Sequence, residues 1–306
     1  MNGIISVLKP PGMTSHDVVY YIRKITGQKK VGHTGTLDPG AAGVLPVCLG
    51  KATRVIEFLP DQKKYRAEVV FGRSTTTQDS FGDTVNECYA GDLDAGLVEQ
   101  YLAGFRGRIE QIPPMVSALK HQGKRLYELA RAGIEVERKP RAVHIYELTL
   151  ISFINDKHKA PRAIIDVHCS AGTYIRTLCH DLGQKVGCGA HMSFLLRTGA
   201  GVFPLESTIT LEKLKEKSIS GEIGEVIVSM SKALEHLPSV SIAGSAVTAV
   251  RCGNKVPLPV TSMEAFASPH RVVRIEGEAG LLALATVSPV AGKPEYRMFQ
   301  PVKVLI

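Results

Sequence analysis

Residues 32–39 form the segment of this sequence whose side chains are best suited to chemistry. They read Gly-His-Thr-Gly-Thr-Leu-Asp-Pro. Glycines permit positive φ angles and a close approach of a ligand to the backbone, and Pro39 biases Asp38 towards an extended conformation. A rigidly held carboxylate could therefore point into a cleft. An Asx-turn, in which Asp38 hydrogen-bonds to its own loop, fits the same residues, and this segment alone does not separate the two interpretations.

A second segment, residues 169–176, combines an aromatic side chain with a cation. It reads Cys-Ser-Ala-Gly-Thr-Tyr-Ile-Arg, which predicts a strand, a turn and the start of a helix. Arg176 would then lie near a helix N-terminus, where a positive charge opposes the helix dipole. An arginine in that place needs a carboxylate or phosphate partner. A surface arginine beside a core Tyr174 is the competing interpretation.

Hydrophobic periodicity predicts the elements that must hold these two segments. Apolar or alternating runs predict strands at 3–8, 44–49, 65–72, 163–169, 191–196, 272–276, 281–287 and 301–305. Helical spacing and end signals predict helices at 15–25, 52–59, 94–103, 124–132, 174–185, 211–217, 229–237 and 245–252. Ser15 is the predicted N-cap of the first helix, and residues 31–43 are predicted to be loop. Strands and helices without a regular βαβ rhythm favour the α+β class, with a domain boundary near residue 238.

The overall composition limits the classes of partner. The 306 residues suffice for roughly two domains, and the formal net charge of +8 favours an anionic partner such as nucleic acid over a basic protein without one. The N-terminus lacks the features of a signal peptide, and no apolar run approaches the roughly 20 residues of a membrane helix. A cytoplasmic protein with six reduced cysteines is therefore expected.

The sequence lacks the residues that characterise several other enzyme classes. Cys179, His180, Cys188 and His191 lie close together, but the first two fall within a predicted helix and no Cys-x-x-Cys pair accompanies them, which disfavours a zinc site. The Gly-x-Ser-x-Gly pattern of serine hydrolases is absent, as are the glycine patterns that bind nucleotide phosphates. We therefore expect no metal, no nucleotide and no other cofactor.

Taken together, six blocks of the sequence occur in a characteristic order between about residues 2 and 200. The blocks are 9–15, 32–39, 43–47, 64–65, 113–118 and 169–178. In residues and spacing they resemble the bacterial tRNA pseudouridine-55 synthases, the TruB family. The resemblance implies an α+β mixed-sheet catalytic domain over residues 1–238 and a small, mostly β, PUA-like RNA-binding domain over 239–306. Ala171 and Ala42 depart from residues common in that family, and the tail after residue 238 resembles it only weakly.

The resemblance also implies roles for individual residues. Asp38 matches the nucleophile, Arg176 the arginine that pairs with it, and Tyr65 a tyrosine that packs on the target base. The residues that it implies at the substrate are His33, which helps to hold the flipped-out nucleotide, Tyr174 and Leu195, which line the uridine pocket, and Lys9, whose segment supports the active-site loop.

The implied reaction breaks the N-glycosidic bond of a uridine, rotates the uracil and rejoins it through carbon. A carboxylate suits this reaction because it can attack and also leave. Asp38 could attack the anomeric carbon, attack the base, or abstract a sugar proton to give a glycal, and the sequence leaves all three routes open. The base must first leave its stack, at a cost of a few kcal/mol, which aromatic groups in the pocket would offset.

The implied partner is the T-loop and stem of a tRNA, bound by a monomer. An insertion at about residues 113–141 is the expected grip on the RNA backbone, through Lys120, Lys124, Arg125, Arg131 and Arg141. A solvated helix and hairpin is the competing interpretation of this insertion. Two further alternatives are a non-catalytic tRNA-folding chaperone, which would not need an Asp-Arg pair and which could coexist with the enzyme, and a guide-RNA-dependent relative similar to dyskerin.

Overall fold

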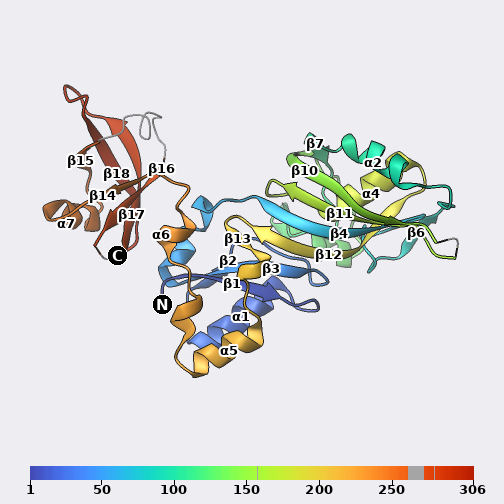
Figure 1. The fold of residues 1–306 in the computed structure, drawn as a ribbon, viewed down its shortest axis with the longest axis horizontal. Helices are drawn as coiled ribbons and strands as arrows, with labels where there is room; N and C mark the ends of the chain where they lie inside the picture. The colour runs from blue at the N-terminus through green and yellow to red at the C-terminus, as the bar shows by residue number, and fades with distance from the viewer. Residues whose placement is uncertain (157, 261–271, 279) are drawn as a thin grey trace.

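Two β-sheets organise the chain in the computed structural model, which describes residues 1–156, 158–260, 272–278 and 280–306. The larger sheet has the strand order β1-β3-β12-β4-β11-β10-β7, with β2 beside β3 and β13 beside β12. Strand β12 is parallel to β3, whereas the other pairs in this sheet are antiparallel. A second sheet, β14-β16-β17-β18-β15, lies at the C-terminal end (Figure 1). Mixed sheets with separate helices confirm the α+β class.

The N-terminal half of the large sheet carries the first predicted segment. Its strands are β1 (Gly3–Lys9), β2 (Val31–His33), β3 (Ala42–Leu49) and β13 (Phe203–Pro204), and its helices are α1 (Ser15–Thr26) and α5 (Leu211–Ile219). Apolar side chains of α1, α5, β1 and β3 form one buried cluster. The prediction of a continuous loop over 31–43 is wrong at both ends, since β2 pairs with β3 from Val31 onward and β3 starts at Ala42. Pairing with a buried strand outweighs the glycine content, and only residues 34–41 stay irregular.

Helix α1 is capped one residue earlier than predicted. The N-cap is Thr14, which forms a reciprocal capping box with Asp17. Ser15 is the first helical residue and is buried. Its hydroxyl accepts the Leu37 N–H at 2.9 Å, so the start of α1 is tied to the loop that carries Asp38.

The other half of the large sheet builds the main core. Its strands are β4 (Lys63–Phe71), β7 (Gly107–Gln111), β10 (Arg141–Ile154), β11 (Arg162–Cys169) and β12 (Ala190–Ala200), and its helices are α2 (Ala95–Ala103) and α4 (Ile175–Val186). The helices pack with these strands in one cluster, as Figure 1 shows at the end of the molecule opposite the C-terminal sheet. Strand β10 escaped prediction because two bulges, at Ile145/Glu147 and Leu150/Ser152, interrupt its alternation of buried and exposed side chains.

The remaining short elements connect these parts. They are η1 (Gly50–Arg54), η2 (Ile56–Phe58), β5 (Arg73–Thr75), β6 (Thr84–Glu87), β8 (Lys120–His121), β9 (Lys124–Arg125), α3 (Leu126–Arg131), η3 (Leu205–Ser207), η4 (Ile223–Val226) and α6 (Met230–Ala233). The helix predicted at 52–59 is two 3₁₀ turns, and the one predicted at 229–237 has only the four residues of α6. Both predictions were therefore too long: Val55 and Leu234, which follow η1 and α6, have left the α-helical region.

The C-terminal sheet begins at residue 239. Its elements are β14 (Ser239–Ser241), α7 (Ser245–Arg251), β15 (Val256–Pro259), β16 (Val272–Gly277), β17 (Gly280–Pro289) and β18 (Tyr296–Val304). Leu281, Leu284 and Leu305 pack in one cluster with Val44 and Ala200 of the large sheet, and Lys303 pairs with Glu57 at 2.8 Å. None of the helices in the described part of the chain combines the length and the apolar character that a membrane span requires.

A glycine controls the closest approach of two strands near the loop. Gly43 has a φ of +117°, and a Cβ at this position would clash with the backbone of Arg197. The parallel pairing of Gly43 with Arg197 therefore depends on the missing side chain. It places Arg197 directly beneath residues 34–41.

Candidate active site

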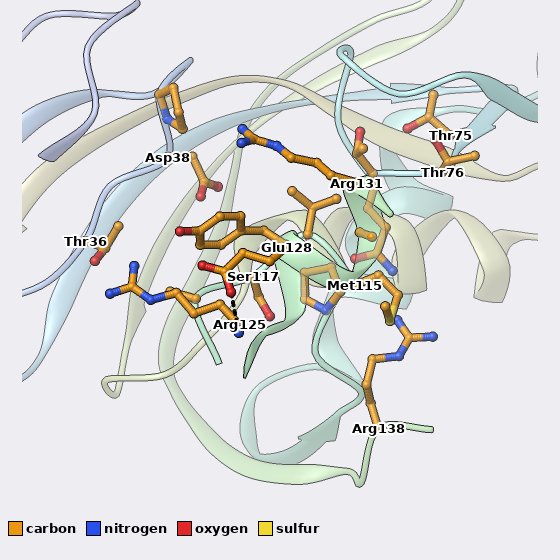
Figure 2. A pocket seen from close by; sticks show the side chains of 18 of the residues that line it. Thr36, Asp38, Thr75, Thr76, Met115, Ser117, Arg125, Glu128, Arg131 and Arg138 are labelled. Atoms are coloured by element: carbon orange, nitrogen blue, oxygen red, sulfur yellow. Dashed lines mark hydrogen bonds between the residues drawn. The ribbon is translucent and has the colours of Figure 1, made fainter. Parts of the chain in front are cut away.

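A cavity of about 1380 Å³ opens between the loop that carries Asp38 and the basic insertion. Its walls come from the start of α1, residues 36–39, the segment 75–78 after β5, residues 114–118, and the insertion around α3. Figure 2 shows Asp38 at this cavity together with Arg125, Arg131 and Arg138 of the insertion. The N-terminal segments, the turn after β5 and the insertion, which are far apart in the sequence, thus share one space.

Asp38 and Arg176 form a two-pronged ion pair at this cavity. Arg176 Nε lies 2.9 Å from Asp38 Oδ2, and its Nη2 lies 3.3 Å from Asp38 Oδ1. The arginine side chain is 5% exposed and the aspartate side chain 40% exposed. The carboxylate is therefore open to a ligand, whereas its counterion is sealed inside the protein.

Three further contacts fix the guanidinium of Arg176. Its Nη2 donates to Val116 O at 2.9 Å, and its Nη1 donates to Thr77 O at 3.3 Å and lies 3.6 Å from Asp79 Oδ2. The other oxygen of Asp79 accepts the Phe81 N–H at 3.0 Å. Sequence reasoning missed Asp79, because a single aspartate in a threonine-rich turn carries no spacing signal.

Lys9 holds the loop from below and does not reach the cavity. It is fully buried, and its ammonium donates to Met13 O at 2.6 Å, Pro10 O at 2.8 Å and Pro39 O at 3.3 Å. Burial lowers the pKa of Lys9 to about 8, against the opposing charge of Asp38. The prediction that Lys9 contacts substrate is therefore corrected: its donors are used by backbone carbonyls, which agrees with the expected support of the loop.

Arg197 supports the same loop from the neighbouring strand. It is 1% exposed and donates to Val44 O at 2.6 Å, Gly35 O at 3.2 Å and Thr36 O at 3.4 Å. Sequence reasoning missed it because the predicted strand ended at residue 196, one position before Arg197, whereas β12 continues to Ala200. A charged residue inside a longer strand at 190–200 would have been the signal.

Tyr65 lies beside Arg197 in the register of β4 and β12. Burial raises the pKa of the Tyr65 phenol, and the charge of Arg197 opposes that shift. The ring packs against the main core, which contains Leu195 (7% exposed) and Leu37. Leu37 lines the cavity, whereas the predicted site residues Tyr65 and Leu195 are not among its lining residues.

Tyr174 lies within electrostatic reach of Asp38 and Arg176, and His33 lies at the end of β2. Tyr174 caps α4, and its N–H donates to the Gln111 side chain at 2.9 Å. Burial raises the pKa of Tyr174. His33 ends β2, its Nδ1 accepts the Gly35 N–H at 3.2 Å, and its ring meets the cavity-lining His16 edge to face at 5.4 Å. Burial lowers the pKa of His33 to about 4, so its ring is neutral at pH 7.

The predicted RNA-gripping residues divide into two groups. Arg125 and Arg131 line the cavity, and their guanidinium carbons lie 5.8 and 5.5 Å from the centre of the Tyr127 ring. Lys120, Lys124 and Arg141 are exposed outside it. Sequence reasoning missed Tyr127, although an aromatic residue between two arginines is a pattern typical of nucleic-acid contacts.

Known proteins match this chain over its whole length. A family model described as the TruB family pseudouridylate synthase N-terminal domain matches residues 23–175, and one described as the tRNA pseudouridylate synthase B C-terminal domain matches residues 176–235. The chain is 48% identical over 307 residues to tRNA pseudouridine synthase B of Pelotomaculum thermopropionicum, covering 100% of this chain and 97% of that protein. It is 42% identical over 308 residues to that of Bacillus subtilis, covering 100% and 98%.

Solved structures show the same fold. A crystal structure of a Cbf5-Nop10-Gar1 complex matches with a TM-score of 0.74 and 32% identity over 99% of this chain and 85% of the other. A structure of an H/ACA RNP bound to a substrate RNA containing 2'-deoxyuridine matches with a TM-score of 0.73 and 30% identity, at 99% and 85% coverage.

The partial burial of His33 leads to a prediction about pH. Since its pKa falls from 6.5 to about 4 on folding, the unfolded chain binds this proton more tightly, and the residue lowers the free energy of unfolding as the pH drops from about 6.5 to about 4. In a histidine NMR titration, we expect the His33 signals, assigned with His33→Gln, to keep their neutral shifts from pH 8 down to pH 5. A midpoint near 6.5 would contradict the partly buried, neutral ring.

Proposed function

The chain belongs to the TruB family of pseudouridine synthases, and from this premise we propose that it isomerises uridine 55 in the T-loop of tRNA to pseudouridine. Membership makes the chain a tRNA pseudouridine synthase, an isomerase that acts on RNA. The choice of the T-loop uridine is the proposed part. The overall reaction moves one bond of the uracil from nitrogen to carbon, so it requires no redox partner and no donor of a chemical group.

We assign the role of nucleophile to Asp38, and the ion pair with Arg176 is the observation that carries this assignment. A carboxylate that is 40% exposed beside a guanidinium that is 5% exposed can meet a ligand without losing its counterion. Two-pronged pairing fixes the carboxylate in angle as well as in distance. Attack on the sugar, attack on the base and formation of a glycal all start from this ionised carboxylate.

The surrounding residues suit a uridine that has left its stack. Tyr65 and Tyr174 present aromatic rings near Asp38, whose charge contributes to the pKa of both phenols. The neutral His33 uses Nδ1 as an acceptor, which leaves Nε2–H as a donor to the nucleotide. These three residues are not among those that line the large cavity, and we propose that they contact the flipped base where it meets Asp38, with Leu195 as apolar support in the adjoining core.

We propose that the insertion and the C-terminal sheet bind the part of the RNA that lies outside the cavity. We propose that Lys120, Lys124, Arg125, Arg131 and Arg141 bind phosphates of the T-stem and T-loop. We also propose a division into a catalytic domain at 1–238 and a PUA-like RNA-binding domain at 239–306, in a monomeric and cytoplasmic enzyme. A chaperone activity on tRNA folding would use the same binding surface and would not need Asp38.

Replacing the proposed nucleophile tests the assignment. With an unmodified tRNA transcript and no added metal or nucleotide, wild type should form one pseudouridine in the T-loop, mapped by carbodiimide treatment and primer extension. Asp38→Asn should lower the rate by about a thousandfold or more while the Kd for tRNA stays within about threefold.

The matched control is Asp166→Asn, which breaks another two-pronged pair, with Arg66 at 2.8 Å on both prongs, outside the cavity. This variant should keep full activity. Undiminished product with Asp38→Asn would refute the nucleophile, and tRNA binding without product in wild type would leave the chaperone function alone.

Salt dependence tests the proposed grip on the RNA backbone. A single phosphate contact contributes about 0.7 to 0.9 to the slope of log K against log salt concentration. Arg131→Gln should reduce the slope by that amount, whereas Lys215→Gln, an exposed residue of α5 outside the cavity, should leave it unchanged. Equal slopes for wild type and Arg131→Gln would remove Arg131 from the set of phosphate contacts.

A further inference from the structure

A large aromatic ring stands in solvent at the turn between β5 and β6. Phe81 is 80% exposed, although a phenylalanine gains about 1.5 to 3 kcal/mol from full burial. Its side chain has no charged or hydrogen-bonding group that would favour contact with water. Single exposed apolar residues are common, so a functional role for this ring has to be argued from its position relative to Asp38.

The ring rests on the loop that carries the proposed nucleophile. A Cβ on Gly40 would lie 2.5 Å from Phe81 Cε2 and 2.7 Å from its Cζ, so the ring edge occupies the space that this glycine leaves free. Gly40 is two residues from Asp38, and Pro39 between them lines the cavity. One edge of the ring thus touches the rim of the cavity, and most of its surface is free.

The turn that carries Phe81 is tied to the ion pair. Its N–H donates to Asp79 Oδ1 at 3.0 Å, and Asp79 Oδ2 lies 3.6 Å from Arg176. The Ser80 N–H donates to Met192 O at 3.1 Å, and the Thr76 N–H donates to Asp83 O at 2.9 Å. Because its backbone is held at both ends of the turn, Phe81 is fixed at a set distance from Asp38.

Two of the segments that line the cavity differ in chemistry. The insertion lines the cavity with three cations, Arg125, Arg131 and Arg138, and two carboxylates, Glu128 and Glu135, of which Glu135 pairs with Arg138 at 3.2 Å. The β5–β6 segment lines it with uncharged residues, Thr75, Thr76, Thr77, Gln78 and Val85. An RNA strand has its charged phosphates along one side and its bases along the other. The arginines of the insertion suit the phosphates, and the uncharged segment beside Phe81 suits the bases.

We propose that Phe81 stacks on the nucleobase next to the target uridine. Once the uridine leaves the stack, a neighbouring base loses a partner, and an aromatic ring restores that contact at about 1 to 3 kcal/mol per base. The ring then acts as a positioning residue that keeps the flipped conformation of the RNA. This inference rests on the proposed T-loop reaction, and the following experiment separates the two.

The test combines Phe81→Leu, which keeps an apolar contact with Gly40 but removes the ring, with tRNAs that are abasic at one or the other nucleotide flanking the target. Single-turnover pseudouridine formation over a range of enzyme concentrations gives the half-saturating concentration. On intact tRNA, Phe81→Leu should raise it about 5- to 150-fold. On the tRNA that lacks the stacked base, the half-saturating concentrations of the variant and wild type should agree within about twofold. Removing the base already removes the stacking contact, so removing the ring as well has no further effect.

Two further variants complete the design. Phe81→Tyr should restore binding to within about threefold of wild type, and Tyr89→Leu, which changes a ring of equal exposure (79%), should have no effect on any RNA. An equal loss on intact and both abasic tRNAs would reduce Phe81 to a packing role, and no loss on intact tRNA would also overturn the inference. If wild type modifies a uridine outside the T-loop, the proposed function fails, and the same cycle on the flanks of that uridine still decides the role of Phe81.

Discussion

The ion pair between Asp38 and Arg176 is the interaction on which the rest of this structure depends. Arg176 stands in the first turn of α4, where its charge opposes the helix dipole, and it is almost fully buried. A buried cation is costly unless its donors are used. Contacts from Asp38, Asp79, Thr77 O and Val116 O meet that need, so the loop, the turn after β5 and the insertion must all converge on one side chain.

A loop that carries an exposed carboxylate also has to be rigid. Residues 34–41 have no regular hydrogen-bond ladder, and their buried carbonyls need donors. Lys9 donates to Pro39 O from β1, Arg197 to Gly35 O and Thr36 O from β12, and the Ser15 hydroxyl to Leu37 O from α1. Two of these donors are cations, so the loop backbone lies in a positive environment beneath the negative Asp38.

Much of this architecture could be predicted from local pattern. The α+β class, the capped helix α2 and the buried strands β1, β3, β4 and β11 follow from hydrophobic periodicity and end signals. The charge of Arg176 against the helix dipole required an anionic partner, and the resemblance to the family identified Asp38, which the structure places at 2.9 Å.

Other features depend on contacts that no local pattern records. Arg197 donates to carbonyls more than 150 positions earlier in the chain. Asp79 belongs to the site only because it lies 3.6 Å from Arg176, which is distant in the sequence. Bulges concealed β10, and the burial of Ser15 against Leu37 moved the N-cap to Thr14. Lys9 was placed near the substrate because sequence cannot tell a donor facing a ligand from one facing backbone.

The most direct measurement replaces Arg176 by lysine, which keeps the charge but cannot pair with a carboxylate through two prongs. The readout is the single-turnover rate of pseudouridine formation at saturating enzyme, together with the Kd for tRNA. If the fixed orientation of Asp38 is central, Arg176→Lys lowers the rate by about 100-fold or more and leaves the Kd within about threefold. A rate within threefold of wild type would contradict the account, because charge alone would then suffice.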